Sequence, residues 1–264
     1  MTVPQALILG IVQGLTEFIP VSSSGHLAII QGLFGLDKHA LIAFDVLVHM
    51  GTLIPVIIIF WEELWKLMKK PFQKMTLLLI IGTLPAVIGV LLLGDSLDIL
   101  FSGGLLLAAA YVVTGTVLWA SDKIEVGQKN EEKTSFFDAL FVGVVQMFAI
   151  MPGISRSGST IAASLFRGLD KKTAASFSFL LSIPAILGAF VFHFDDIFRG
   201  QVMTETVGLA AGLTGFLAAM VSGYVAIRVM LRLIQRRNLK VFSYYVFALA
   251  AFLVIDHFVL RMIF

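Results

Sequence analysis

The sequence lacks cysteine and is poor in charge. None of its 264 residues is cysteine, which excludes disulfides and thiolate metal sites, and charged residues make up only 14% of the chain. The net charge of +2 is small and the basic residues fall between apolar stretches, so nucleic acid is not an expected partner. The first residues also lack a basic segment and a small-residue cleavage pattern, so we expect no cleaved signal peptide.

Hydrophobic residues dominate what is present. They make up 58% of the chain and the mean hydropathy is +0.96, which is too apolar for the surface of a soluble domain. We therefore predict an all-α integral membrane protein. A helix needs about 20 residues to cross about 30 Å of hydrocarbon, and six segments are apolar and long enough to do so. The six predicted transmembrane helices are 42–60, 75–93, 103–120, 173–192, 207–231 and 242–262.

Two further apolar segments, 4–34 and 136–166, are interrupted near their middle by proline, glycine and serine. Each half is too short to span a bilayer, so we predict a re-entrant helical hairpin at each segment. Broken helices of this kind are tolerated inside a membrane only where they line a polar cavity. The two hairpins therefore mark the expected site.

The two hairpins belong to an internal repeat. A shift of 133 residues superimposes identical residues at many positions. The matches include Ala6 with Ala139, Gly10 with Gly143, Gln13 with Gln146, Ser22 with Ser155, Ser24 with Ser157, Gly25 with Gly158, and 35–38 with 168–171. We predict one membrane domain of two repeats, 1–133 and 134–264, with a solvated linker at 127–133. Each repeat has one hairpin and three crossings, and this odd number inverts the second copy relative to the first.

Lysine and arginine are distributed as an inverted repeat predicts. They are concentrated in three connections, 61–74, 121–135 and 232–240. The alternate connections, 94–102 and 193–206, contain only Arg199. By the positive-inside rule the first three connections are cytoplasmic and both termini are outside. The first hairpin then enters from the outer face and the second from the cytoplasmic face, so that their tips meet near the midplane.

Arg156 and several hydroxyl residues lie at the centre of the second hairpin, and the segments that flank them are almost wholly apolar. An unpaired guanidinium inside a bilayer costs several kcal/mol, so this one must face a cavity, an anion or a carboxylate. Pro152 and Gly153 interrupt the preceding helix, and the helix that resumes presents its positive end to the same place. This arrangement predicts an anion site.

The first hairpin supplies complementary groups. Gln13 and Glu17 are four residues apart on one helix face, and Ser23 and His26 are three apart on the next helix. With Arg156 they form the inventory of a phosphoryl-transfer site: an acid or base, a nucleophile, an imidazole and a cation. Taken singly, Glu17 is equally well explained as a structural partner of Arg156, and serines in membrane helices usually serve packing. Their convergence at two repeat-related tips favours the functional interpretation.

These residues strongly resemble the motifs of the undecaprenyl-diphosphate phosphatase family, which is also known for bacitracin resistance. The first motif is QGLTEFIPVSSSGH at 13–26 and the second is PGISRSGST at 152–160, and the resemblance extends over nearly the whole chain. It implies removal of the terminal phosphate from undecaprenyl diphosphate, which gives the monophosphate lipid carrier of cell-wall synthesis. It further implies a divalent cation, Mg²⁺ or Ca²⁺, and a multi-pass enzyme of the bacterial inner membrane whose site opens to the extracytoplasmic side.

The expected site draws on both motifs. We assign catalysis to Glu17, Ser23, His26 and Arg156. We assign substrate binding to Gln13, Ser22, Ser24, Gly153, Ser155, Ser157 and Thr160. The family motif accepts Glu or Gln at its first position, and this chain has Gln13 there. Glu17 is therefore the expected essential carboxylate, acting as a base or as the metal ligand.

Several choices stay open. Ser23, activated by Glu17, is the first candidate for the nucleophile, ahead of a directly attacking water and of His26. Asp45 and His49 could line the same cavity from the first spanning segment, although a structural hydrogen bond explains them equally well. Inverted repeats with broken helices are also a transporter design, so a lipid-phosphate flippase or anion transporter is the alternative function, and a non-catalytic lipid-binding subunit is another. The expected partners are membrane lipids and the lipid substrate, with a homodimer as one possible assembly.

Overall fold

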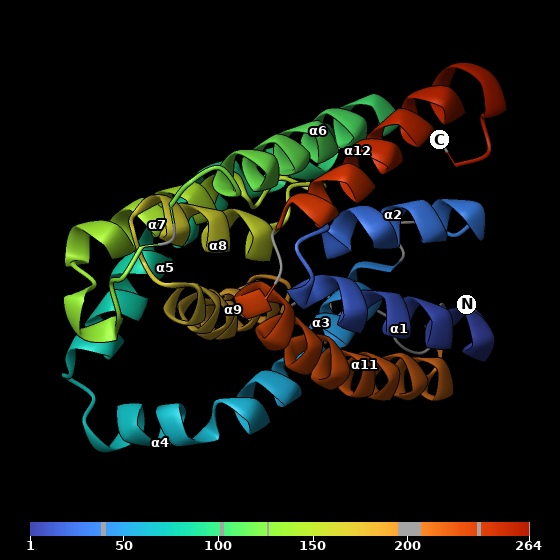
Figure 1. Ribbon diagram of the computed structural model, residues 1–264. Coiled ribbons are helices and arrows are strands. Elements are labelled where there is room, and N and C mark those ends of the chain that lie inside the picture. The colour runs from blue at the N-terminus through green and yellow to red at the C-terminus, as the bar shows by residue number, and fades with distance from the viewer. Residues whose placement is uncertain (38–40, 101–102, 126, 195–206, 237–238, 264) are drawn as a thin grey trace.

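The computed structural model describes residues 1–264 except 38–40, 101–102, 126, 195–206, 237–238 and 264. The side chains of 93–100 and of residue 236 are likewise left undescribed. Within the described ranges the secondary structure is helical and no β-strand occurs (Figure 1). The all-α prediction is therefore confirmed.

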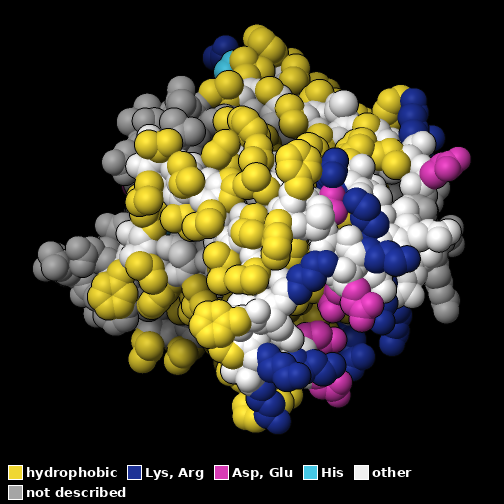
Figure 2. Space-filling view, turned by 90° about the vertical axis from the view of Figure 1, so that its left-hand side faces the viewer, with side chains coloured by type: hydrophobic (Ala, Val, Ile, Leu, Met, Phe, Trp, Pro, Cys, Tyr) yellow, Lys and Arg dark blue, Asp and Glu magenta, His cyan; other side chains and the backbone are white. Residues whose placement is uncertain are grey.

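Six described helices are long and apolar enough to cross a membrane, as predicted. They are α3 (Ile42–Ile59), α5 (Lys74–Leu100), α6 (Gly104–Ser121), α9 (Lys171–Phe192), α11 (Leu209–Arg236) and α12 (Lys240–Ile255), the last continued by a π-helical turn, η4 (Asp256–Leu260). Large apolar side chains cover much of the surface, and charged side chains gather along one side of the face shown in Figure 2. Such a surface suits a lipid environment, so this is a multi-pass membrane protein.

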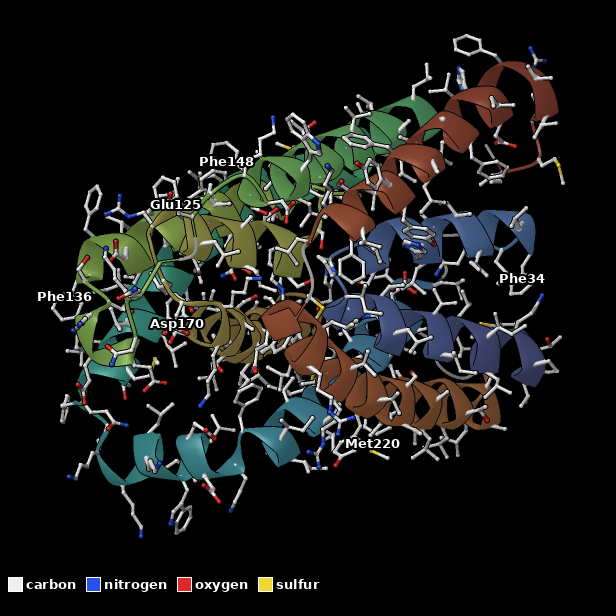
Figure 3. All side chains as sticks on the ribbon, viewed as in Figure 1. Phe34, Glu125, Phe136, Phe148, Asp170 and Met220 are labelled. Carbon is white, nitrogen blue, oxygen red and sulfur yellow. The ribbon has the colours of Figure 1, made fainter. Side chains whose placement is uncertain are left out.

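Two pairs of shorter helices occupy the segments predicted to form hairpins. The first pair is α1 (Val3–Phe18) with α2 (Ser23–Leu33), and the second is α7 (Phe136–Phe148) with α8 (Arg156–Phe166). None of the four is long enough to span a bilayer alone. Their tips lie in the interior of the bundle (Figure 3). That the pairs re-enter the membrane from opposite faces stays a prediction.

Repeat-related residues begin these pairs in the same way. Thr2 and Ser135, which the 133-residue shift superimposes, are the N-caps of α1 and α7. Each forms a capping box with the residue three positions on, Gln5 or Asp138, so that two otherwise unpaired backbone N–H groups are satisfied. The same local chemistry therefore starts both hairpins.

The hairpin helices pack across the repeats. Helix α1 of the first half lies along α11 of the second, and α7 of the second half lies along α5 of the first (Figure 1). Glycines permit both contacts: a Cβ on Gly10 would lie 2.3 Å from the carbonyl oxygen of Gly215, and one on Gly143 would lie 2.5 Å from that of Gly82. The 133-residue shift superimposes Gly10 on Gly143 and Gly82 on Gly215. One backbone contact thus occurs twice, and each half holds the hairpin of the other.

Asp138 fastens the connection between the halves. Its buried carboxylate lies 3.1 Å from Lys129 Nζ and 2.7 Å from Arg167 Nε, and it accepts a hydrogen bond from the Ser135 N–H. Burial alone would raise the pKa of Asp138, but the bonds from Ser135, Arg167 and Lys129 outweigh that effect and hold the pKa at about 2. The stabilisation from this carboxylate is complete above its ordinary pKa of 3.8 and is lost only as the pH falls through about 2.

The connections differ from expectation at two places. The linker at 127–133 is not simply solvated, because Lys129 forms a backbone bridge to the 168–170 turn, with Lys129 N–H donating to Gly168 and Asp170 N–H donating to Lys129. The connection at 61–74 contains a helix, α4 (Trp61–Lys69), that buries no side chain. Tertiary contacts order the linker, whereas α4 projects from the bundle (Figure 1).

We predict that Gly10→Ala and Gly143→Ala each lower the free energy of unfolding by about 1–3 kcal/mol, because the added Cβ meets backbone that cannot move aside. The measurement is the thermal unfolding midpoint in detergent. Gly188→Ala in α9 is the matched control, since a Cβ there meets nothing within 4 Å. Equal stability of all three variants would contradict the close packing of α1 on α11 and of α7 on α5.

Candidate active site

Two interrupted helix pairs bring their tips together. Ser22 caps α2 with φ of 69°, and Gly153 precedes α8 with φ of 90°. The backbone of each hairpin therefore turns through a conformation with positive φ. The tips touch directly, because the Gly153 N–H donates to Ser24 Oγ at 3.3 Å and Ser157 Oγ donates to the Ile19 carbonyl at 3.5 Å. The positive ends of α2 and α8 therefore converge, as the sequence pattern predicted.

Glu17 is the centre of the polar contacts. Its carboxylate is 7% exposed, and Arg156 NH2 lies 2.6 Å from Oε1. On Oε2 it accepts hydrogen bonds from Ser23 Oγ at 2.6 Å and from Gln13 Nε2 at 3.0 Å. His49 Nε2 lies 3.6 Å from the same oxygen. Three of the predicted site residues and one histidine thus surround one carboxylate from four different helices.

Arg156 bridges the two halves of the chain. Its side chain is 15% exposed, and besides the contact with Glu17 it donates through NH1 to the Ser178 carbonyl at 3.2 Å. A guanidinium offers five N–H donors in a planar fork, and these two contacts use two of them. Arg156 is therefore partnered by a carboxylate and still has donors for an anion.

Ser23 and Glu17 have the geometry of a nucleophile and its base. Ser23 is the first residue of α2, and its hydroxyl donates to Glu17 at 2.6 Å, within the distance that proton transfer requires. The same position lies at the positive end of a helix, where a phosphoryl group binds favourably. The arrangement supports Ser23 as a nucleophile and leaves its role a prediction.

The structure places His26 away from Glu17. Its Nδ1 lies 2.7 Å from the Ser22 carbonyl oxygen, and its Nε2 lies 2.8 Å from the Tyr245 hydroxyl. The imidazole beside Glu17 belongs instead to His49, whose Nδ1 lies 2.6 Å from the Asp45 carbonyl oxygen. The four-residue spacing of Asp45 and His49 in an apolar helix was the sequence signal for this contact.

His49 faces Glu17 with its unprotonated side when it is neutral. A carbonyl oxygen only accepts hydrogen bonds, so the Asp45 carbonyl requires the proton of His49 on Nδ1. Nε2 of neutral His49 then directs its lone pair towards the Glu17 carboxylate. A proton bound by Nε2 or by the carboxylate makes this contact between the two side chains attractive. The side chain of the same residue, Asp45, is held in place by Gln31, whose Nε2 donates to the Asp45 carboxylate at 2.8 Å.

The remaining hydroxyls mostly brace the second tip. Ser155 accepts from the Gly158 N–H as the N-cap of α8, and Thr160 Oγ1 lies 2.6 Å from Ser178 Oγ. Thr114 of α6, which the sequence did not indicate, donates to the Gly153 carbonyl at 3.2 Å and accepts from the Ser155 N–H at 3.0 Å. These contacts orient the backbone N–H groups, and the substrate-binding role of the hydroxyls stays a prediction.

A divalent cation at Glu17 stays a prediction. Within the described part of the chain no three His, Asp or Glu side chains converge as metal ligands. Both oxygens of Glu17 already contact donors, Arg156 on one and Ser23 and Gln13 on the other. A cation prefers several oxygen ligands, and beside Glu17 these could come from the Ser23 hydroxyl and from the buried Oε1 of Gln13, which has no hydrogen-bond partner.

Comparison with known proteins gives consistent matches over most of the chain. The model of the family described as bacitracin resistance protein BacA matches residues 6–252. The undecaprenyl-diphosphatase of Carboxydothermus hydrogenoformans is 49% identical over 93% of this chain and 94% of its own length. Undecaprenyl-diphosphatase 4 of Bacillus thuringiensis is 44% identical over 95% of both chains. The undecaprenyl-diphosphatase of Methanobrevibacter smithii is 42% identical over 93% of this chain and 94% of its own length.

We predict that Arg156→Lys reduces turnover of a polyprenyl diphosphate on the order of 100-fold, because an ammonium cannot reproduce the planar fork that reaches Glu17, Ser178 and an anion together. The positive charge beside Glu17 is kept, so the variant should still fold. Phosphate release and the thermal midpoint are the two measurements. Near-normal turnover with normal stability would reduce Arg156 to a structural partner of Glu17.

Proposed function

The chain belongs to the bacitracin resistance protein BacA family, and from that membership we infer that it is a membrane-embedded undecaprenyl-diphosphatase. It hydrolyses undecaprenyl diphosphate to undecaprenyl phosphate and inorganic phosphate. The observation in the structure that best supports this reaction is the contact of Glu17 with both Ser23 and Arg156 where the two tips meet.

The substrate makes two demands that this fold can meet. Its polyprenyl tail dissolves in the membrane, and its diphosphate is a concentrated anion that needs a shielded cationic pocket. The apolar surface of the bundle suits the tail. Arg156 and the N-termini of α2 and α8 offset the charge of the head group and of the transition state.

The geometry supports a two-step displacement. Ser23 Oγ attacks the terminal phosphorus, its proton passes to Glu17, and the bond to the bridging oxygen breaks so that undecaprenyl phosphate leaves with the electron pair. Glu17 gives this proton to solvent and then takes one from a water that attacks the phosphorus of the phosphoserine. The bond from phosphorus to Ser23 Oγ breaks, Glu17 returns the proton to that oxygen, and inorganic phosphate is released. Arg156 binds the diphosphate through the donors that Glu17 and Ser178 leave free, and the second oxygen of Glu17 accepts the proton of Ser23.

The location of the site relative to the membrane is part of the proposal. We place the protein in the bacterial inner membrane with the site open to the extracytoplasmic side and the two helix pairs re-entrant from opposite faces. The lysines and arginines of 61–74, 121–135 and 232–240 support this orientation. The homodimer and the divalent cation stay predictions.

This orientation predicts the labelling of two single-cysteine variants. Gly103→Cys, at the exposed start of α6, should react with a membrane-impermeant maleimide in intact cells, and Gln128→Cys should react only after lysis. The natural chain has no cysteine, so unmodified protein is the background control. The reverse pattern would invert the orientation, and labelling of both from one side would contradict the crossing count.

Phosphate release from the purified protein in detergent tests the function. Wild-type protein should liberate phosphate from undecaprenyl diphosphate, whereas a flippase or a lipid-binding subunit would bind the lipid unchanged. Ser23→Ala removes only the hydroxyl 2.6 Å from Glu17 and should abolish turnover while it retains lipid binding. A rapid acid quench of the wild type should trap phosphoserine. Substantial hydrolysis by Ser23→Ala would favour a water activated by Glu17 as the nucleophile.

A further inference from the structure

His26 is held between two tyrosines that come from the paired helices α6 and α12. The Tyr111 ring meets it edge-on, with the hydroxyl 3.1 Å from Nδ1. The Tyr245 ring stacks on it at 5.7 Å between centroids and 13° between planes, with the hydroxyl 2.8 Å from Nε2. The sequence pattern indicated a role for His26 but for neither tyrosine.

Hydrogen bonding determines which nitrogen carries the proton. The Ser22 carbonyl, 2.7 Å from Nδ1, can only accept, so Nδ1 is protonated. Nε2 of the neutral ring is then an acceptor, and the Tyr245 hydroxyl donates to it. Direct attack by His26 on phosphorus would need the Nε2 lone pair that this hydroxyl occupies. Neither nitrogen therefore faces the substrate directly.

The two tyrosines differ in their access to a ligand. Tyr111 is fully buried, and its hydroxyl fits over Gly25, where a Cβ would lie 2.5 Å from it. Tyr245 is 48% exposed on α12, although Val246 beside it is buried. Tyr245 is therefore the accessible polar group of this cluster. It contacts His26, which lies one helical turn after Ser23 on α2.

We propose that His26 acts through Tyr245, whose hydroxyl is the group presented to the diphosphate head group of the lipid. The proposal rests on the phosphatase function and adds a substrate-binding residue to it. A tyrosine hydroxyl has one proton to donate and can also accept. When the Tyr245 hydroxyl donates instead to a phosphate oxygen, Nε2 of His26 takes up one proton from solvent and donates it as a hydrogen bond to the Tyr245 oxygen. The hydrogen bond between the two residues then reverses its direction.

An anionic ligand favours this reversed state. Among the described residues, the polar groups that contact His26 are the Ser22 carbonyl and the hydroxyls of Tyr111 and Tyr245, all uncharged near neutral pH. A bound diphosphate would bring negative charge to this cluster. Separated from His26 only by the Tyr245 hydroxyl, it would stabilise the protonated imidazole. The chain from Ser22 through His26 and Tyr245 then ends in a charge-assisted hydrogen bond to phosphate.

Tyr245→Phe tests the proposal because it keeps the stacked ring and removes only the hydroxyl. Tyr244→Phe is the matched control: Tyr244 is the preceding residue, is 59% exposed, and has the Lys240 ammonium over its ring. We expect Tyr245→Phe to reduce kcat about tenfold, the usual value of one such hydrogen bond, and Tyr244→Phe to leave kcat unchanged. In the background of His26→Ala, Tyr245→Phe should have a smaller effect than in the wild type, because His26 no longer strengthens the hydrogen bond of Tyr245.

A second measurement does not depend on turnover. Nitrogen-15 spectra of the histidine side chains are recorded with and without a prenyl methylenediphosphonate, a diphosphate analogue that is not hydrolysed. The analogue should shift the His26 resonances in the wild type and in Tyr244→Phe but not in Tyr245→Phe. His26→Ala identifies the resonances.

The outcomes separate this proposal from the function on which it rests. Equal kcat in the two phenylalanine variants, additive effects of Tyr245→Phe and His26→Ala, or unchanged His26 shifts in Tyr245→Phe would overturn the role of Tyr245 in an active enzyme. A wild type that releases no phosphate would instead overturn the function. The spectra with the analogue would then still decide whether His26 senses a bound diphosphate through Tyr245.

Discussion

The ion pair between Glu17 and Arg156 is the contact on which the centre of this structure depends. Each charge lies on a different helix pair, in a bundle whose other interior side chains are mostly apolar. A buried charge that loses its partner typically costs about 3–5 kcal/mol, so each residue makes the other tolerable. The pair therefore requires that the two tips meet. It also places the remaining donors of the guanidinium where an anion can bind them beside the carboxylate.

Packing across the repeats makes this meeting possible. Because α1 lies on α11 and α7 on α5, each hairpin is held by the other half, and the tips are directed towards each other. The glycine contacts at Gly10 and Gly143 are equivalent under the repeat, but the polar centres are not. Glu17 and Ser23 of the first copy correspond to Ile150 and Arg156 of the second. A symmetric scaffold thus carries an asymmetric site, in which one half supplies a carboxylate and a serine and the other an arginine.

The polar residues at the tips divide into two groups by their contacts. Those that contact the carboxylate, Ser23, Gln13 and His49, are placed to take part in chemistry. The capping hydroxyls and Thr114 satisfy backbone groups that the helix breaks leave open, which a membrane interior demands. The rigid backbone that they produce keeps the helix N-termini directed at one place.

The sequence by itself determined the helices, the repeat and the core of the site. A bilayer demands about 20 apolar residues for each crossing, so hydropathy alone identified the six spanning helices, and a lone Arg156 among apolar residues required a partner such as Glu17. Only the tertiary structure decided which histidine faces Glu17 and which faces a tyrosine. Spacing along one helix shows which side chains share a face but not what packs against that face. His49, Thr114 and Tyr245 reach the tips from α3, α6 and α12, and those contacts exist only because long-range helix packing brings segments distant in sequence together.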